Sequence, residues 1–158
     1  MATYLLAVGD RHLENLLIGK QGHIFHVDFG YILGKNPPNK GFKVPPIRLN
    51  KPMMQVFGEH ANESYSEWKG KCIDAFIKLR NYRHFLLNFV MIMADSAIPN
   101  LQPNEVIKVL NEMNERFLPR ISEEAARKEF DQIIDKSVTA SFAEFMEIAH
   151  KVAVAVKY

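Results

Sequence analysis

The chain has 158 residues, of which 47% are hydrophobic and 24% are charged, and its formal net charge is +2. These values are ordinary for a globular chain that forms one domain and buries a core. The single cysteine, Cys72, excludes an internal disulfide framework and is typical of a reducing compartment. No apolar run approaches the roughly 20 residues that span a bilayer, and the apolar residues 1–8 lack the features of a signal peptide. We therefore expect a cytoplasmic, soluble protein.

The segment Asp10-Arg11-His12-Leu13-Glu14-Asn15 is followed, thirteen residues after its asparagine, by Asp28-Phe29-Gly30. A kinase needs a proton acceptor beside the attacking hydroxyl, and an amide and a carboxylate that hold metal on the ATP phosphates. Protein kinases meet this need with H-R-D-x-x-x-x-N and a later D-F-G. Here the asparagine also lies five residues after the aspartate, but the tripeptide reads D-R-H. The pattern predicts phosphoryl transfer, and the inverted tripeptide separates two kinds of kinase.

A β-hairpin is predicted between the two halves of this motif. Residues 16–18 and 23–27 are strand-like apolar runs, and residues 19–22 form a turn that contains glycine. Such a hairpin would bring Asn15 and Asp28 side by side at its open end, as two ligands of one metal ion require. The alternative is a hairpin whose polar residues only cap turns.

A basic, proline-rich segment follows the Asp-Phe-Gly tripeptide. From Tyr31 to Lys51 there is no acidic residue, and four of the eight prolines lie in this stretch. Such a segment cannot form a helix and is costly to bury, so we expect a surface loop that faces anions. In isolation a solvated linker would be the favoured interpretation, but kinases place their activation loop at this position. The positive charges are Lys35, Lys40, Lys43, Arg48 and Lys51.

The chain changes character near residue 50, and the remainder is helix-forming. We expect a helix over 62–79 that begins with the capping box Ser64–Glu67, and a central buried helix over 82–97 that is apolar nearly all round. Further helices are expected to begin at Pro103 and Ser122, and a last one at the capping box Ser141–Glu144. The fold class is α+β, mainly α, with the element order of the C-terminal lobe of a protein-kinase-like fold.

Three stretches resemble the phosphatidylinositol 3-kinase family, most closely its class III, vacuolar-sorting type. They are the residues 3–17 around the D-R-H motif, the residues 25–34 around Asp-Phe-Gly, and Pro45-Pro46-Ile47-Arg48-Leu49-Asn50-Lys51. The resemblance continues through the helices. It implies that residues 1–158 form the C-terminal lobe of a phosphatidylinositol 3-/4-kinase catalytic domain. That lobe would have a catalytic loop at 9–16, an activation loop at 28–50, a helical remainder at 51–158 and no N-terminal lobe.

The resemblance also implies a role for each motif residue. His12 would accept the proton of the inositol 3-hydroxyl, Asp10 would orient it, and Arg11 would brace the loop. Asn15 and Asp28 would hold Mg²⁺ or Mn²⁺ on the phosphates of ATP. The remaining implied contacts are the ATP pocket at Leu17, Val27, Phe29 and Gly30, and the lipid-facing loop at Lys35, Lys40, Lys43 and Arg48.

The function implied is transfer of the ATP γ-phosphate to the 3-hydroxyl of phosphatidylinositol, in membrane trafficking and autophagy signalling. The 158-residue chain alone would be inactive. The resemblance further implies a peripheral location on endosomal or autophagic membranes. Its partners would be phosphatidylinositol, a regulatory protein-kinase-like subunit, a coiled-coil protein and the missing N-terminal lobe, with no nucleic acid.

Two alternatives remain open at this stage. Asn39-Lys40-Gly41-Phe42 has some likeness to the 4-kinases, so the lobe could belong to a phosphatidylinositol 4-kinase or a related protein kinase. The second alternative is a non-catalytic module that docks on a membrane or a partner. It rests on the mixed apolar and basic last helix, with Val152, Val156 and Tyr158 as membrane-facing residues, although packing of that helix in the core would give the same pattern.

Overall fold

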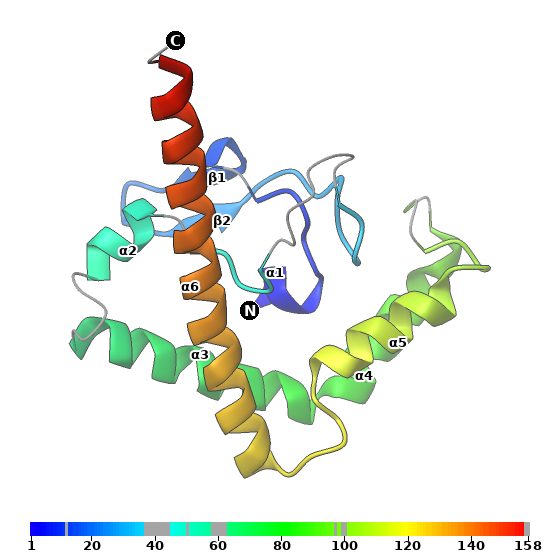
Figure 1. Cartoon of the computed structure of the whole chain (residues 1–158). Helices are drawn as coiled ribbons and strands as arrows, with labels where there is room; N and C mark the ends of the chain where they lie inside the picture. Colours follow the sequence, from blue (N-terminus) through cyan, green and yellow to red (C-terminus); the bar gives the residue numbers. More distant parts are fainter. Residues whose placement is uncertain are drawn as a thin grey trace.

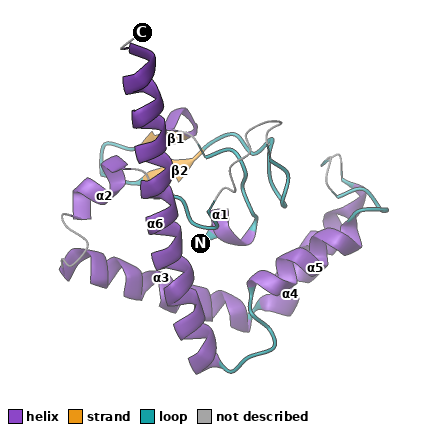
Figure 2. Cartoon of the chain, in the orientation of Figure 1, coloured by secondary structure: helices purple, strands orange, loops and turns teal. Residues whose placement is uncertain are grey.

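The computed structural model describes residues 1–11, 13–36, 45–49, 51–57, 63–96, 98 and 101–156. It is mainly helical with one small antiparallel sheet, as the sequence predicts (Figure 1 and Figure 2). Helix α6 crosses the long helix α3, while α4 and α5 lie together to one side and the sheet lies behind α6. The elements are α1 (Ala2–Leu5), the 3-10 turn η1 (Leu13–Asn15), β1 (Leu16–Ile18), β2 (Ile24–His26), α2 (Lys51–Phe57), α3 (Glu63–Asn81), α4 (Arg83–Ile92), the 3-10 turn η2 (Met93–Asp95), α5 (Val106–Arg116) and α6 (Glu123–Val156).

The predicted hairpin is confirmed. β1 and β2 pair antiparallel, with Leu17 opposite Phe25 in the register. The Gly19 amide donates to the His23 carbonyl at 2.8 Å and closes the turn. Gly22 adopts φ +80°, a left-handed conformation that glycine takes without steric cost. The turn residues therefore set the register that the flanking strands follow.

A second set of backbone contacts joins residues 6–9 to residues 31–35. The Gly9 amide donates to the Tyr31 carbonyl at 2.8 Å, and the Leu33 amide donates to the Leu6 carbonyl at 2.6 Å. A Cβ atom on Gly9 would lie 2.3 Å from the Lys35 carbonyl oxygen. No side chain fits there, so Gly9 permits the segment after Asp-Phe-Gly to lie against the segment before Asp10.

The core is built around aromatic side chains from three distant parts of the chain. Phe76 of α3 and Phe130 of α6 are fully buried and stack with ring centroids 4.1 Å apart. Tyr4 of α1 meets Phe130 edge to face at 5.2 Å, and its hydroxyl donates to the Arg116 carbonyl at 3.0 Å. Burial raises the pKa of Tyr4 to about 12, against the opposing charge of Arg116. The core thus ties the N-terminal segment to the helices.

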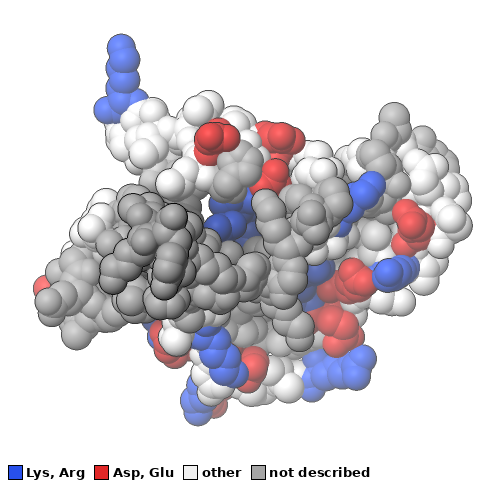
Figure 3. Space-filling view, turned by 45° about the horizontal axis from the view of Figure 1, so that its top comes forward, with Lys and Arg blue, Asp and Glu red and all other residues white. Residues whose placement is uncertain are grey.

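Ion pairs reinforce the crossing of α3 and α6. The Lys69 ammonium lies 2.6 Å from a carboxylate oxygen of Asp131 and 2.8 Å from one of Asp135. Although partial burial works against its charge, the hydrogen bonds that the ammonium donates to these two carboxylates raise the pKa of Lys69. Arg127 also reaches Asp74 at 2.8 Å. On the face shown in Figure 3, basic and acidic side chains alternate rather than separating into two large patches.

The prediction of a central buried helix over 82–97 is wrong. The helical part is shorter, α4, and Val90 is its only buried residue among those described. Phe85 is 60% exposed and Ile92 is 79% exposed. A helix with apolar residues on every face can be buried on every face. Its sequence does not determine whether other elements pack against each of those faces. In this structure α4 packs mainly on α5, so the opposite face stays open.

The helix boundaries differ from the prediction in three further places. Ser141–Glu144 does not begin a helix, because α6 runs without a break from Glu123 to Val156. No glycine or proline interrupts residues 135–141, so nothing in the backbone stops the preceding helix. Likewise α3 begins at Glu63, before the predicted capping serine, and α5 begins at Val106 rather than Pro103. At Ser122 the capping prediction is confirmed, since its hydroxyl accepts the Ala125 amide at 3.2 Å.

Among the described residues, no helix has both the length and the hydropathy that a transmembrane span requires.

Candidate functional site

The hairpin places Asn15 and Asp28 at its open end. The Val27 amide donates to the Asn15 carbonyl at 2.8 Å, which extends the ladder by one step beyond β1 and β2. Asp28 follows Val27 directly, two residues after the end of β2. The Asn15 side chain is 8% exposed, and its Nδ2 atom has no hydrogen-bond partner in the described part of the chain. A buried amide without a partner costs free energy, and such a group is often kept for a ligand.

Asp28 takes a backbone conformation that few residues adopt. Its φ is +66°, which asparagine and aspartate tolerate better than other side chains with a Cβ atom. The Gly30 amide donates to Oδ1 of Asp28 at 2.9 Å, so the carboxylate closes a turn over its own tripeptide. The residue is exposed, and within the described part of the chain its second carboxylate oxygen makes no hydrogen bond. One carboxylate oxygen therefore remains for a ligand.

An amide and a carboxylate together form a donor set that suits Mg²⁺. This ion prefers oxygen ligands and is commonly held by one or two protein carboxylates together with substrate phosphates. Within the described ranges, no group of three or more His, Cys, Asp or Glu side chains is placed to hold a metal by itself. The pair Asn15 and Asp28 therefore fits a metal that arrives with a phosphate ligand better than a self-sufficient metal centre.

An exposed apolar surface adjoins this pair. Leu17 and Phe25, paired across the hairpin, are 47% and 50% exposed, and Phe29 is 52% exposed. Val27 is half-buried, whereas Gly30 is exposed. The Phe29 ring meets the His26 ring edge to face at 5.5 Å. Strand patterning did not predict this ring contact. Both ring nitrogens of His26 are buried without a hydrogen-bond partner among the described residues.

Arg11 joins the catalytic-motif segment to the end of the basic loop. Its guanidinium donates to the Pro45 carbonyl at 2.7 Å and to the Pro46 carbonyl at 2.9 Å. Burial, together with the nearby positive charge of Arg48, lowers the pKa of Arg11 to about 10. The two prolines carry no N–H, so their carbonyls are the only backbone groups by which this stretch can be held. The family resemblance implied that Arg11 braces the loop, but the two proline carbonyls lie 34 and 35 positions away, and no local pattern in the sequence indicated them.

The other predicted site residues divide into four groups. Lys35 is exposed and Arg48 is half-buried near Arg11, so the structure brings one of the two beside the motif. Asp10 is half-buried at the start of the motif. The backbone of α6 includes Val152 and Val156, whose side chains lie outside the description. The predicted residues that lie outside the described ranges altogether are His12, Lys40, Lys43 and Tyr158.

The motif, the hairpin and the metal-compatible pair are those of a kinase, and the chain's relatives agree with this class. Residues 1–103 match the family described as Phosphatidylinositol 3- and 4-kinase. The chain belongs to this family.

Individual relatives extend the similarity to nearly the whole chain. The chain is 42% identical over 151 residues to Phosphatidylinositol 3-kinase pik3 of Schizosaccharomyces pombe, covering 96% of this chain and 18% of that protein. It is 38% identical over 153 residues to Phosphatidylinositol 3-kinase VPS34 of Saccharomyces cerevisiae, covering 96% of this chain and 17% of that protein. It is 37% identical over 149 residues to Phosphatidylinositol 3-kinase VPS34 of Arabidopsis thaliana, covering 94% of this chain and 18% of that protein. The chain thus spans less than a fifth of the length of these relatives.

Proposed function

We propose that the chain is the C-terminal lobe of a phosphatidylinositol 3-kinase of class III. In this proposal the lobe serves transfer of the ATP γ-phosphate to the 3-hydroxyl of phosphatidylinositol. The observation that carries it is the open end of the hairpin, where the backbone hydrogen bond from Val27 to Asn15 holds Asn15 opposite the residue that precedes Asp28. The names of the similar proteins support the choice of the 3-kinases within the family.

Asn15 and Asp28 would hold Mg²⁺, which when bound neutralises the charge on the phosphates of ATP. The chain's own contribution is to fix the two ligands before the nucleotide arrives. Pairing with β2 fixes the Asn15 backbone, and the turn to Gly30 fixes the Asp28 carboxylate. Ligands that are held in place need no costly reorganisation during the reaction. The exposed apolar surface formed by Leu17, Phe25 and Phe29 would receive the adenine base.

His12 would act as the general base, because an imidazole with an unperturbed pKa of about 6.5 accepts a proton near neutral pH. Asp10 would orient it from two residues earlier in the same loop. Arg11 has a separate task in this scheme, since its guanidinium is committed to the carbonyls of Pro45 and Pro46. The catalytic loop at 9–16 and the activation loop at 28–50 would thus be held in one arrangement.

The lipid would approach along the activation loop. Lys35 and Arg48, with Lys40 and Lys43 in the same loop, would attract an anionic membrane at about 1 kcal/mol for each charge near the surface. Because phosphatidylinositol is a membrane lipid, we propose peripheral action on endosomal and autophagic membranes. A regulatory kinase-like subunit and a coiled-coil subunit complete the proposal as partners of the whole enzyme.

The proposal is tested with a chimera in which residues 1–158 replace the matching segment of pik3 from Schizosaccharomyces pombe. We expect the chimera to phosphorylate phosphatidylinositol in vesicles, and chromatography of the deacylated product to give the 3-phosphate. A 4-phosphate product would assign the lobe to the 4-kinases. Absence of lipid phosphorylation by a folded chimera would contradict the proposal.

Asp28→Asn supplies the residue-level test within the chimera. Asparagine tolerates the left-handed backbone, so this variant removes the charge without the strain that alanine would add. We expect the rate to fall by at least about 100-fold, since a metal ligand at the transferring phosphate supplies several kcal/mol. Glu105→Gln, which neutralises an exposed carboxylate next to α5, is the matched control and should leave the rate within twofold of the parent. Equal rates in both variants would remove Asp28 from the site.

A further inference from the structure

We propose that Ser137 of α6 is a positioning residue that fixes the segment Pro45–Leu49 beside the catalytic loop. The inference rests on the proposed function for its kinetic consequence, but its structural part stands on contacts within the chain. Ser137 lies about 90 positions away from this segment in the sequence, and its spacing along α6 marks it as one more core position.

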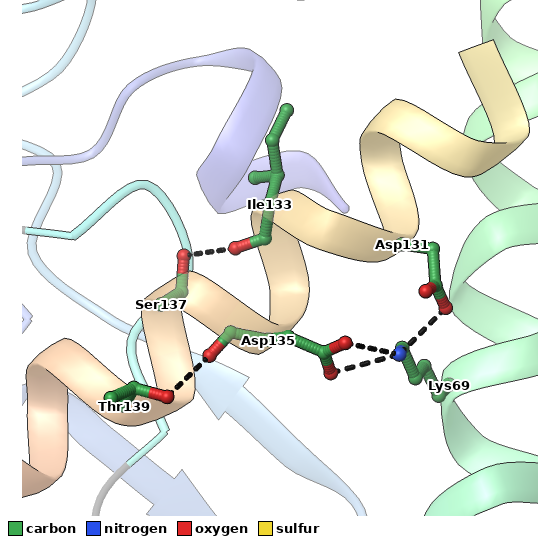
Figure 4. A network of polar contacts seen from close by, with 6 residues as sticks. All are labelled: Lys69, Asp131, Ile133, Asp135, Ser137 and Thr139. Atoms are coloured by element: carbon green, nitrogen blue, oxygen red, sulfur yellow. Dashed lines mark hydrogen bonds and ion pairs between the residues drawn. The ribbon is translucent and has the colours of Figure 1, made fainter. Parts of the chain in front are cut away.

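The Ser137 hydroxyl is oriented by two hydrogen bonds. It donates to the Ile133 carbonyl one turn earlier in α6 at 2.6 Å, and it accepts the Ile47 amide at 3.3 Å. Ser137 is 1% exposed. A hydroxyl has one donor, and here the helix uses it, so the oxygen lone pairs are left to face the loop. In Figure 4 this side chain lies on the side of α6 away from the Lys69 ion pairs.

The loop offers few other groups by which it can be held. Pro45 and Pro46 have no N–H, so the Ile47 amide is the first backbone donor after them. Arg11 binds the two proline carbonyls from one side, and Ser137 binds the Ile47 amide from the other. Three consecutive residues are therefore held between the catalytic motif and α6. The side chains of Ile47 and Leu49 pack against the core and close the same end of the loop.

Arg48 lies between these anchored residues. Its charge is near enough to Arg11 to act on that guanidinium, which places it beside the catalytic motif. A shift of the Ile47 amide would move Arg48 with it, because the two residues share a peptide bond. The expected consequence is weaker recognition of the anionic lipid headgroup, with no change at the hairpin residues that would meet the nucleotide.

Thr139 provides a matched control two residues further along α6. Its hydroxyl also donates to the carbonyl one turn earlier, that of Asp135 at 3.0 Å, as Figure 4 shows. Thr139 is exposed, and its hydroxyl bonds within α6 rather than to the loop. Thr139→Ala therefore removes the same kind of hydroxyl from the same helix without touching Ile47.

The test is hydrogen exchange of the 158-residue chain, measured by mass spectrometry on peptides that contain residues 45–49 and on peptides from α5. We expect Ser137→Ala to speed exchange in residues 45–49 by about tenfold, with the α5 peptides unchanged. Ser137→Cys, which keeps the volume but accepts hydrogen bonds poorly, should speed it in the same direction. Thr139→Ala should leave it unaltered. Unchanged exchange in both Ser137 variants, or an equal rise in the Thr139 variant, would overturn the anchor.

The kinetic consequence is read in the pik3 chimera. Ser137→Ala should raise the KM for phosphatidylinositol by about tenfold while the KM for ATP stays within twofold, a split that general destabilisation would not produce. An unchanged lipid KM would overturn the link between the anchor and lipid recognition. A chimera without lipid kinase activity would instead contradict the proposed function, and hydrogen exchange would still decide whether Ser137 holds the loop.

Discussion

The hairpin and loops of residues 6–36 differ from the helical core in what keeps their shape. In the core, fully buried side chains such as Phe76, Phe117 and Phe130 fix the packing of α3, α5 and α6. In the loops, backbone hydrogen bonds and left-handed residues do so, as at Gly9 and Asp28. Apolar side chains of the hairpin remain largely exposed, including Ile18 at 73%.

This difference explains why the motif residues lie where they do. A core tolerates little but well-packed apolar groups, whereas a site for phosphates needs polar atoms that are held without being covered. Backbone pairing provides such a hold. Tyr4 and Ser137 connect the loops to helices α5 and α6, and Arg11 joins the motif segment to the loop at Pro45. A small number of contacts with the helical core therefore fixes the position of the loops.

Removal of a core ring should give the largest effect. We expect Phe130→Ala to lower the free energy of unfolding by about 3–5 kcal/mol, since it leaves a cavity where the ring stacks on Phe76. Phe85→Ala is the matched control on the exposed face of α4, where the side chain is 60% exposed. It should cost about 1 kcal/mol or less. Urea unfolding followed by circular dichroism measures both, and similar losses would mean that α4 is covered after all.

A second comparison uses the same substitution in the two regions, with opposite signs expected. Gly9→Ala should destabilise the chain by about 3 kcal/mol, because the new Cβ would overlap the Lys35 carbonyl oxygen. Gly70→Ala in α3 meets nothing within 4 Å and should stabilise it by about 1 kcal/mol through helix propensity. Thermal melts report both changes. A neutral Gly9→Ala would show that residues 6–9 and 31–35 do not lie in close contact.

The smallest of the three effects concerns pH and the link between the regions. The pKa of Tyr4 rises from 10.0 to about 12 in the fold, chiefly through burial. Its neutral form therefore favours the folded state fully below pH 10, and this contribution of roughly 2–3 kcal/mol is lost as the pH rises toward 12. Tyr4→Phe should flatten the alkaline part of the stability curve, measured by urea unfolding at stepwise pH. An equally steep alkaline loss in Tyr4→Phe would assign it to other groups.

The sequence predicts well those features that depend on neighbouring residues. Gly19 and Gly22 mark the hairpin turn, and the apolar runs on either side of it predict the two strands that pair. Helical periodicity also finds the buried positions of α3 and α5, such as Phe76 and Met113. These signals are local, because both strand pairing across a short turn and helix faces follow from residues close in the chain.

The features that were missed depend on distant partners. An apolar α4 does not reveal whether a neighbour covers it, and the serine in Ser141–Glu144 resembles a cap only until the preceding helix is known to continue. Ser137 likewise reads as a core position until Ile47 is seen beside it. The close approach of the Lys35 carbonyl explains why position 9 requires glycine, but only the fold shows which part of the backbone lies against it.

The uninterrupted length of α6 has a mechanical consequence. Its 34 residues form a rod about 50 Å long, and the Lys69 contacts with Asp131 and Asp135 act as a fulcrum near residue 133. Ser137 is about 6 Å from that fulcrum along the axis, while the end at Val156 is about 35 Å away. A 10° tilt that swings the far end by about 6 Å would displace Ser137 by only about 1 Å. Tilting of α6 about these ion pairs would therefore displace the loop far less than it displaces the C-terminal end of the helix. Rotation of α6 about its axis, or translation along it, would move Ser137 and the loop directly.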